Sequence, residues 1–470
     1  MIFGHLWATD ETDAWFSDEG RTREWMEILE ALALAQGELG LIPAAAAGAI
    51  AGRMREPVDL EAVASETRAT GHSTLGLIRV LQRDLGADAR EWVYFGATVQ
   101  DVSDTWTGMV MRRMLAIAER DLGAIEAALA RLAGEHRDTV MLGRTHGQPG
   151  LPITFGYKAA VWLAEVRRHR ERVAQARPRL VVGQLAGAVG TLSAWGSGGL
   201  ELQRRVLDRL GLGVPEIPWT AARDRVAELV ALLALITGTL AKVGNEIYNL
   251  QRPEIGEVAE AATEGVVGSI TMPQKHNPER SEHLVTLARV VRSSADLALE
   301  GVVGEHERDG AAWKTEWELL PRACRAAAVA LRLGGELLDG LQVNRERMRA
   351  NVEAQYGYVL AEPVMLALGE QVGPRRAHEL VHAAAARGRA AGVSFREALA
   401  SDPDIPDLDL DSLLRPESAL GAARDLVDHV LAAAESPDAT RGAAAADDPL
   451  GTSAADRHVS AAERPIAESS

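Results

Sequence analysis

Apolar residues recur every three or four positions over residues 111–132, which places them on one face of a helix of about six turns. Residues 221–251 form a second long helical pattern, and their central part, 229–241, is apolar almost all round, so other helices must enclose it. Helix-forming residues also dominate 279–300 and 317–341, whereas alternation of β-branched residues is scarce. We therefore predict an all-α protein whose middle is a bundle of long helices.

The same patterns divide the chain into four parts. We expect shorter helices, separated by turn signals, in an N-terminal domain of residues 1–104, the long bundle helices in 105–350, and a small C-terminal helical domain in 351–435. Residues 436–470 contain no aromatic side chain and offer little apolar surface to bury, so we expect a disordered tail. The enclosed helix also indicates an oligomer, because one subunit of this size need not supply enough helices to cover it.

The composition is that of a soluble globular protein, with 47% hydrophobic and 25% charged residues. A formal net charge of −17 argues against a nucleic-acid partner, which would require a basic surface. The apolar stretch 229–241 is too short to span a bilayer, and the first residues show no secretory signal, so we expect no membrane partner. A single cysteine, Cys324, excludes a disulfide framework and a cysteine-rich metal site. These features together favour a cytoplasmic enzyme.

Residues 265–278 form the segment richest in candidate chemistry, with glycines, prolines and polar side chains directly before a predicted helix. Glycines allow a loop to bring its amides close to a ligand. The dipeptide Asn277-Pro278 is typical of a helix start, where free N–H groups favour an anion. Ser269, Lys275 and Asn277 could therefore meet one carboxylate. The alternative, on pattern alone, is a solvated loop between two helices.

This segment resembles the signature loop of the fumarase/aspartase superfamily, usually Gly-Ser-Ser-x-Met-Pro-x-Lys-x-Asn-Pro. The matching positions are Gly268, Ser269, Met272, Pro273, Lys275, Asn277 and Pro278, while Ile270 replaces the customary second serine. Residues 96–101 (Gly-Ala-Thr-Val-Gln-Asp) and 143–149 (Gly-Arg-Thr-His-Gly-Gln-Pro) resemble two further blocks of that superfamily, in the same order. The resemblance spans roughly residues 1–430 and leaves out only the tail.

Such a resemblance implies a three-domain subunit and a homotetramer, in which twenty helices form the core and each active site combines residues of three subunits. It also implies an anti elimination across a succinyl unit that releases fumarate. Ser269 would remove the C3 proton as general base, Lys275 and Asn277 would stabilise the dianion that forms, and Met272 would contact the substrate. The expected partners are a small dicarboxylate substrate and further copies of the chain, and no cofactor is implied.

The resemblance assigns His146 as the general acid for the leaving group, with Glu282 of another subunit orienting its imidazole. A carboxylate on one imidazole nitrogen fixes the tautomer and stabilises the imidazolium. Thr98, Gln100 and Thr145 are candidate donors to the substrate carboxylates. Residues of these types are equally common as helix caps and turn residues, and that alternative stays open for each of them.

Four residues bear on the leaving group. His72 matches a substrate-side histidine of adenylosuccinate lyases, and Arg308 is the best candidate to hold the distal carboxylate or nitro oxygens, because its guanidinium is a planar fork. At Trp313 and Trp317, adenylosuccinate lyases carry a serine and an arginine that help to hold the nucleotide. An indole cannot replace a guanidinium against phosphate, which counts against a nucleotide substrate.

The surrounding pattern resembles the carboxymuconate cycloisomerase branch, yet bacterial members of that branch often have tryptophan in place of His146. The combination is similar to nitrosuccinate lyases, which serve the biosynthesis of nitro and diazo antibiotics. We therefore expect a carbon–nitrogen lyase that converts nitrosuccinate to fumarate and nitrite. The alternatives are a 3-carboxy-cis,cis-muconate cycloisomerase and an adenylosuccinate or argininosuccinate type of C–N lyase.

Two interpretations from other classes remain. His378-Glu379-Leu-Val-His382 fits the His-Glu-x-x-His motif of zinc proteases, but no third ligand is apparent, so we expect no metal site. The fold could also serve as a scaffold, as in lens crystallins related to this superfamily. A scaffold has no need of the candidate catalytic residues, and their presence together argues against that interpretation.

Overall fold

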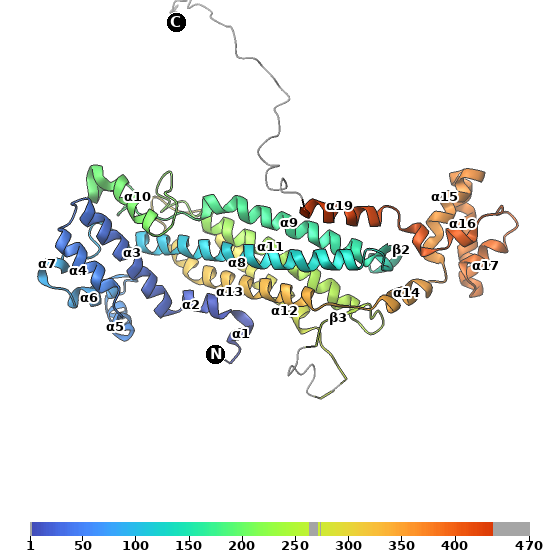
Figure 1. The fold of residues 1–470 in the computed structure, drawn as a ribbon, viewed down its shortest axis with the longest axis horizontal. Coiled ribbons are helices and arrows are strands. Elements are labelled where there is room, and N and C mark those ends of the chain that lie inside the picture. Colours follow the sequence, from blue (N-terminus) through green and yellow to red (C-terminus); the bar gives the residue numbers. More distant parts are fainter. Residues whose placement is uncertain (1, 263–270, 273, 436–470) are drawn as a thin grey trace, which may run out of the picture. The chain divides into compact units, whose positions relative to one another are not determined.

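The computed structural model describes residues 2–262, 271–272 and 274–435. Helices make up nearly all of the regular structure there, and the strands are limited to two short antiparallel pairs (Figure 1). This confirms the predicted all-α class. The chain divides into two compact units, Met1–Leu431 and Ala432–Ser470. The described residues of the second unit are the last turn of helix α19 (Ala423–Glu435), and the predicted disordered tail, 436–470, lies outside the described residues.

Short helices and one long one precede the bundle. They are α1 (Gly4–Trp7), α2 (Asp10–Phe16), α3 (Asp18–Glu38), α4 (Ala44–Met54), α5 (Leu60–Thr70), α6 (Leu75–Arg83) and α7 (Ala87–Arg90). The long α3 packs against α4 and against the first part of the bundle. A four-residue loop between α5 and α6 carries His72, so this predicted site residue is presented on a loop between two helices.

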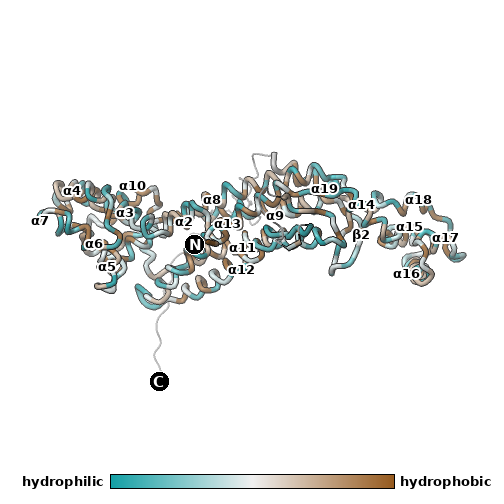
Figure 2. Tube along the Cα trace, turned by 90° about the horizontal axis from the view of Figure 1, so that it is seen from below, coloured by the Kyte–Doolittle hydropathy of each residue, from teal (hydrophilic) through white to brown (hydrophobic). Residues whose placement is uncertain are grey.

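The bundle consists of long helices whose apolar sides pack on one another. They are α8 (Val99–Glu135), α9 (Phe155–Leu180), α11 (Asp224–Leu250), α12 (Glu279–Glu300) and α13 (Gly310–Asp339). The pattern of residues predicts four of the five, and α12 begins and ends where it was expected. Helix α13 begins seven residues before the predicted 317, because the Asp309 carboxylate caps the N–H groups of Ala311 and Ala312. Teal and brown segments alternate along these helices (Figure 2), as amphipathic helices require.

Ion pairs between helices fix the direction of the bundle helices. Arg131 near the end of α8 bonds to Asp339 at the end of α13, at 3.3 Å, so these two helices run parallel. Arg280 at the start of α12 lies 3.8 Å from Glu336 near the end of α13, so α12 runs the opposite way. We call the end where α8 and α13 begin the Thr98 end. The opposite end, where α12 begins, is the hairpin end.

Helix α11 is the only helix, within the described residues, that is long and apolar enough to cross a membrane, and 61% of its most apolar window is buried inside the protein. It packs against α9, α12 and α13. Leu235, in the middle of the apolar stretch, nevertheless stays 55% exposed. The predicted enclosure on every side is therefore incomplete among the described residues, because none of their helices covers the side of Leu235.

Two strand pairs and a group of short helices complete the described chain. The hairpin joins β1 (Val140–Thr145) to β2 (Gln148–Thr154), and β3 (Val258–Ala259) pairs with β4 (Gln342–Val343). Further elements are α10 (Gly199–Arg209), α14 (Arg345–Glu353), α15 (Ala361–Val372), α16 (Pro374–Ala391), α17 (Phe395–Ala400), α18 (Leu410–Leu413) and α19 (Ala423–Glu435), with 3₁₀ turns η1 (Ser193–Gly198), η2 (Tyr358–Leu360) and η3 (Pro416–Ala419). Helices α15 to α18 share a hydrophobic core of their own. The domain boundaries at 104, within α8, and at 350 stay predictions.

His169 of α9 is a buried histidine that should make the fold sensitive to acid. Its Nε2 lies 2.8 Å from Thr239 Oγ1 of α11, and burial lowers its pKa to about 4. The unfolded chain then binds this proton more tightly, so the free energy of unfolding falls as the pH drops from about 6.5 to about 4. Urea unfolding measured across this pH range should show that the free energy of unfolding falls less in His169→Gln than in the wild type. The exposed His378→Gln serves as control, and identical pH profiles of wild type and His169→Gln would contradict the prediction.

Candidate active site

Thr98 and Arg308, both predicted to bind substrate, lie in direct contact. Thr98 is the N-cap residue of α8, and both terminal nitrogens of the Arg308 guanidinium donate to its Oγ1 at 3.1 Å. Arg308 also donates to the carbonyl oxygen of Ala188, at 3.0 Å. The three residues come from segments far apart in the chain. The structure thus brings two of the predicted site residues together at the Thr98 end of the bundle.

Asp101 holds the loop that flanks this pair, although sequence reasoning did not single it out. Its buried carboxylate accepts the N–H of Thr98 at 2.8 Å, of Ala186 at 2.7 Å and of Gly187 at 3.1 Å. Burial raises the pKa of Asp101 to about 7, although the hydrogen bonds from these three N–H groups lower it. An acidic residue three positions after a threonine N-cap is the signal that could have identified it.

Gln100 lies inside the bundle in this structure. It is completely buried, and its amide nitrogen donates to Asp104 Oδ2 at 3.0 Å and to the carbonyl oxygen of Thr220 at 2.9 Å. The helical period turns position 100 into the bundle while Thr98 stays at its end. Both amide hydrogens are thus used within the chain, and the role of Gln100 as a substrate donor stays a prediction.

A buried ion network holds the helices at the Thr98 end. Arg223, just before α11, donates to Asp104 Oδ2 of α8 at 2.8 Å and to Glu316 Oε1 of α13 at 2.8 Å. All three side chains are nearly inaccessible to solvent. Because Asp104 follows Thr98 by six residues and Glu316 follows Arg308 by eight, this network fixes the two helices that carry the Thr98–Arg308 pair.

His146 lies at the tip of the β1–β2 hairpin. His146 and Gly147 form its two-residue turn, with φ of 53° and 72°, as a type I′ turn requires. Histidine tolerates this left-handed conformation better than most residues. His146 and the adjacent Thr145 are exposed. Within the described part of the chain, the imidazole has no hydrogen-bond or salt-bridge partner, so it is available to a ligand or a second chain.

An ion pair with the buried Glu257 holds the base of the hairpin in place. Arg144 Nη1 and Nη2 donate to the two oxygens of Glu257, at 2.8 and 2.7 Å, and Glu257 is completely buried. The amide nitrogen of Asn351 donates to the same carboxylate at 2.8 Å. A bidentate pair of this kind fixes both the distance and the orientation of the two side chains. Because Arg144 is only two residues from His146, the pair also fixes the position of the hairpin tip that carries His146.

The start of α12 differs from the prediction in one respect. Its N–H groups were expected to be free for a substrate anion, but Glu260 occupies two of them, accepting from Arg280 N at 3.2 Å and Ser281 N at 2.9 Å. The anion at this helix start is the chain's own carboxylate. Asn277 lies beside it and donates to Glu279 Oε1 at 3.3 Å. Lys275 remains exposed.

Ser269, the predicted base, lies outside the described residues. Met272 is described and exposed, and its carbonyl oxygen accepts the N–H of Lys275 at 2.9 Å. Glu282, in the first turn of α12, is exposed. The side chains of Lys275 and Glu282 have no hydrogen-bond or salt-bridge partner in the described part of the chain. The hairpin end therefore presents a histidine, a lysine and a carboxylate to its surroundings.

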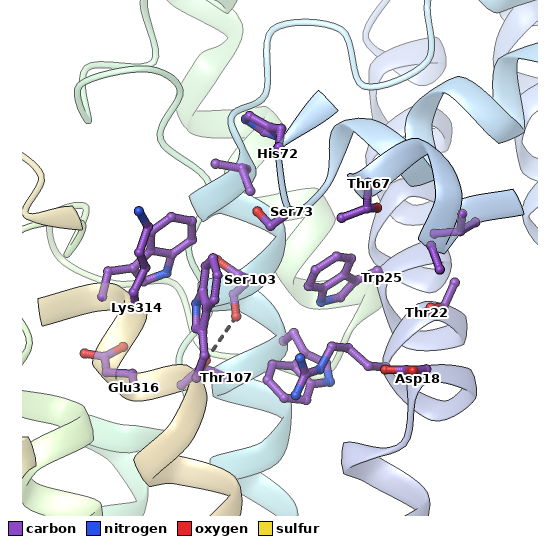
Figure 3. A pocket seen from close by; sticks show the side chains of 18 of the residues that line it. Asp18, Thr22, Trp25, Thr67, His72, Ser73, Ser103, Thr107, Lys314 and Glu316 are labelled. Atoms are coloured by element: carbon purple, nitrogen blue, oxygen red, sulfur yellow. Dashed lines mark hydrogen bonds between the residues drawn. The ribbon is translucent and has the colours of Figure 1, made fainter. Parts of the chain in front are cut away.

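His72 faces a cavity of about 800 Å³ at the Thr98 end (Figure 3). Its Nδ1 accepts the N–H of Leu75 at 3.2 Å, which ties it to the start of α6. Val99, the residue after Thr98, lines the same cavity, as do Trp313 and Trp317. Three residues that the sequence singled out separately thus meet at one cavity, next to the Thr98–Arg308 pair.

The candidate residues form two groups at opposite ends of the bundle. Helix α8 has 37 residues, so its length of about 55 Å separates Thr98 from the region where the hairpin begins. Lys275, Asn277 and Glu282 lie at the start of α12, at the hairpin end. One chain cannot bring His146 to Arg308. A site that uses both groups has to combine the Thr98 end of one chain with the hairpin end of another.

The His-Glu-x-x-His motif lies on α16, apart from both groups. The rings of His378 and His382 stack with centroids 6.2 Å apart, and both side chains are exposed. Glu379 forms ion pairs with Arg375 and Arg376. No group of three potential metal ligands occurs within the residues that the structure describes.

Comparisons with known proteins show which family this chain resembles. Residues 6–293 match the family model described as Lyase, and 357–430 match the one described as Adenylosuccinate lyase C-terminus. The chain is 39% identical to N-acetyl-S-(2-succino)cysteine lyase of Dickeya dadantii (strain 3937), over 92% of this chain and 96% of that protein. It is 38% identical to 3-carboxy-cis,cis-muconate cycloisomerase of Pseudomonas aeruginosa, over 89% and 93%. The crystal structure of fumarate lyase from Mesorhizobium sp. BNC1 is 37% identical and superposes with a TM-score of 0.85, covering 91% and 98%.

Removing Arg223 should destabilise the Thr98 end. Arg223→Leu leaves Asp104 and Glu316 buried without a cation, and breaking a buried pair in this way typically costs about 3–5 kcal/mol. Chemical unfolding should therefore shift to clearly lower denaturant. The matched control is Arg204→Leu, which removes an arginine whose ion pairs with Glu201 and Asp208 are exposed, and should have little effect. Equal shifts in the two variants would contradict a structural role of the network.

Proposed function

The chain belongs to the fumarase/aspartase superfamily of lyases, and from this premise we propose that it eliminates a substituent from C2 of a 2-substituted succinate and releases fumarate. The observation that carries the proposal is the pair of complementary ends. Arg308 and Thr98 form a preorganised polar contact at one end, and at the other Lys275, His146 and Glu282 are exposed, without partners among the described residues. A succinyl dianion needs a cation for each carboxylate, and Arg308 and Lys275 supply one each.

The elimination follows from the residues in these roles. Ser269, the base predicted from the sequence, acts as its alkoxide: it takes the proton from C3 and becomes the neutral hydroxyl, and the electrons of that C–H bond delocalise into the adjacent carboxylate. Lys275 and Asn277 stabilise the dianion that results. The C2–C3 double bond then forms while the bond from C2 to the substituent breaks. Protonated His146, oriented by Glu282 of another subunit, gives its proton to the leaving group.

We propose a homotetramer with shared sites. The separation of Thr98 and His146 within one chain supports it, because antiparallel packing of two bundles places a hairpin end beside a Thr98 end. The exposed side of α11 around Leu235 supports it too, since further helices can cover it only from another chain. A cytoplasmic location and a place in antibiotic biosynthesis stay predictions from the sequence.

The substituent has more than one candidate. The relative named N-acetyl-S-(2-succino)cysteine lyase supports a thiol leaving group, so that carbon–sulfur cleavage joins carbon–nitrogen cleavage as a proposal. Nitrosuccinate, expected from the combination of His146 with Trp313 and Trp317, stays a prediction. The cycloisomerase reaction stays the second candidate, because a relative of nearly equal identity carries that name. It would yield a lactone and no fumarate.

Substrate assays test the reaction directly. We expect the protein to release fumarate from at least one of N-acetyl-S-(2-succino)cysteine, nitrosuccinate and adenylosuccinate. Fumarate is measured by its ultraviolet absorbance. Carboxymuconate is the fourth substrate and tests for lactone formation. Ser269→Ala should lower turnover at least about 10²-fold, because a positioned general base is worth that factor or more. Ser293→Ala, an exposed serine of α12, is the matched control. Absence of fumarate from every substrate, or lactone formation alone, would refute the proposal.

Mixing two inactive variants tests the shared site. Arg308→Ala and His146→Ala should each abolish most turnover, since each removes one group from every site. Hybrids formed by dissociating and reassociating an equal mixture should regain on the order of one quarter of wild-type turnover, because a site that draws the two groups from different chains is then intact by chance. The unmixed variants taken through the same procedure are the control. If confirmed hybrids recover no turnover, the proposal that one site takes Arg308 and His146 from different chains is contradicted.

A further inference from the structure

The cavity at the Thr98 end has walls of a distinctive kind. Its indole side chains come from three different helices: Trp25 from α3, Trp106 from α8, and Trp313 and Trp317 from α13. Figure 3 shows Trp25, His72 and Lys314 reaching the cavity from separate segments. Trp313 and Trp317 pack edge to face with ring centroids 4.8 Å apart, and Trp317 stays 40% exposed. Such walls suit a ligand with a flat or aliphatic body.

Three cations line the same cavity: Arg21, Arg68 and Lys314. None of the three has a salt bridge within the described part of the chain, whereas most arginines of this acidic protein do. Of the two lining carboxylates, Glu316 is already bound by Arg223, which leaves exposed Asp18 as the only counter-charge among the described lining residues. The cavity therefore carries an excess of positive charge, which favours an anionic ligand.

Unsatisfied donors in this wall point to the same kind of ligand. Arg21 Nε, Trp25 Nε1 and Trp106 Nε1 are buried and have no acceptor within the described part of the chain. The Arg21 guanidinium lies over the Trp106 ring, 4.7 Å from its centroid. A buried donor without an acceptor typically costs about 1–3 kcal/mol, so a ligand oxygen toward which one of these side chains turns its donor would recover that cost.

We propose that this cavity receives the leaving group, and that the leaving group is an organic acid with a planar or aliphatic body and a carboxylate. The proposal rests on the proposed elimination, since it names the substituent that C2 carries. Val99 lines the cavity directly beside Thr98, so a succinyl unit held by Thr98 and Arg308 has the cavity as its neighbour.

The size of the cavity separates this proposal from nitrite. A volume of about 800 Å³ lies within the range of roughly 300–1,000 Å³ that accommodates drug-sized ligands. Nitrite has only three heavy atoms and would leave nearly all of it empty. Four indoles with single cations from separate helices also suit one carboxylate better than a phosphate dianion, which favours clustered arginines and backbone N–H groups.

Calorimetric titration of the full-length protein tests the cavity without requiring turnover. The probe is 3-phenylpropionate, which combines a ring with a carboxylate, and it is compared with acetate and with AMP. We expect 3-phenylpropionate to bind at least about tenfold more tightly than acetate, because the ring adds burial against the indoles. Lys314→Gln and Trp317→Ala should each weaken it about threefold to tenfold. Both side chains are exposed, so the variants should fold, and the control Arg375→Gln removes a 95% exposed arginine of α16.

The outcomes distinguish the cavity from the reaction. Loss of affinity in Lys314→Gln and Trp317→Ala but not in Arg375→Gln, together with competitive inhibition of fumarate release from N-acetyl-S-(2-succino)cysteine, supports the proposal. Absence of binding, affinity indifferent to both variants, or tighter binding of AMP overturns it, whether or not fumarate is released. Binding as expected with no fumarate from any 2-substituted succinate would instead refute the proposed function, and with it the role of the cavity as a leaving-group site.

Discussion

The length of α8 determines how this protein can work. A helix of 37 residues is about 55 Å long and does not bend back on itself, so the groups at its two ends cannot meet within one chain. Thr98 and Arg308 are at one end, and the hairpin with His146 and the start of α12 are at the other. If the proposed elimination uses both groups, oligomer formation is therefore a condition of the chemistry. The exposed part of α11 gives the same assembly an apolar surface to bury.

The buried carboxylates of both ends serve the protein itself. Asp104 and Glu316 bind Arg223, Glu257 binds Arg144, and Glu260 caps α12. Each of these carboxylates is thus already bound by a group of the same chain. The chain has a net charge of −17, yet each end carries a cation for the proposed substrate, Arg308 at one end and Lys275 at the other. The overall charge thus says little about the charge at the site, because several carboxylates of both ends are already bound within the chain.

The sequence predicts features that depend on local pattern and misses those that depend on packing. The start of α12 is correct because Asn-Pro marks a helix start by local backbone preference. The partners of Gln100 are not evident from the sequence, because only the packed bundle shows that position 100 turns inward. The cap supplied by Glu260 and the contact between Thr98 and Arg308 join residues about 20 and 210 positions apart, and no local pattern contains that information. Ser269, the predicted base, lies outside the described residues, so its role rests on the resemblance alone.

The proposed substrate has two parts, the succinyl unit and the substituent on its C2, and different residues recognise each of them. The succinyl unit requires only two carboxylate contacts and a proton path, and these use few residues at the ends of helices. From the sequence, Trp313 and Trp317 could be used only to exclude a phosphate, since an indole offers it no charge. The structure shows what the two indoles contribute. They form an apolar wall beside cations that have no salt bridge with any described residue. An enzyme that released only nitrite would gain nothing from such a wall. A bulky acid gains both burial and charge from it, and its binding energy can then help to position C2 for elimination.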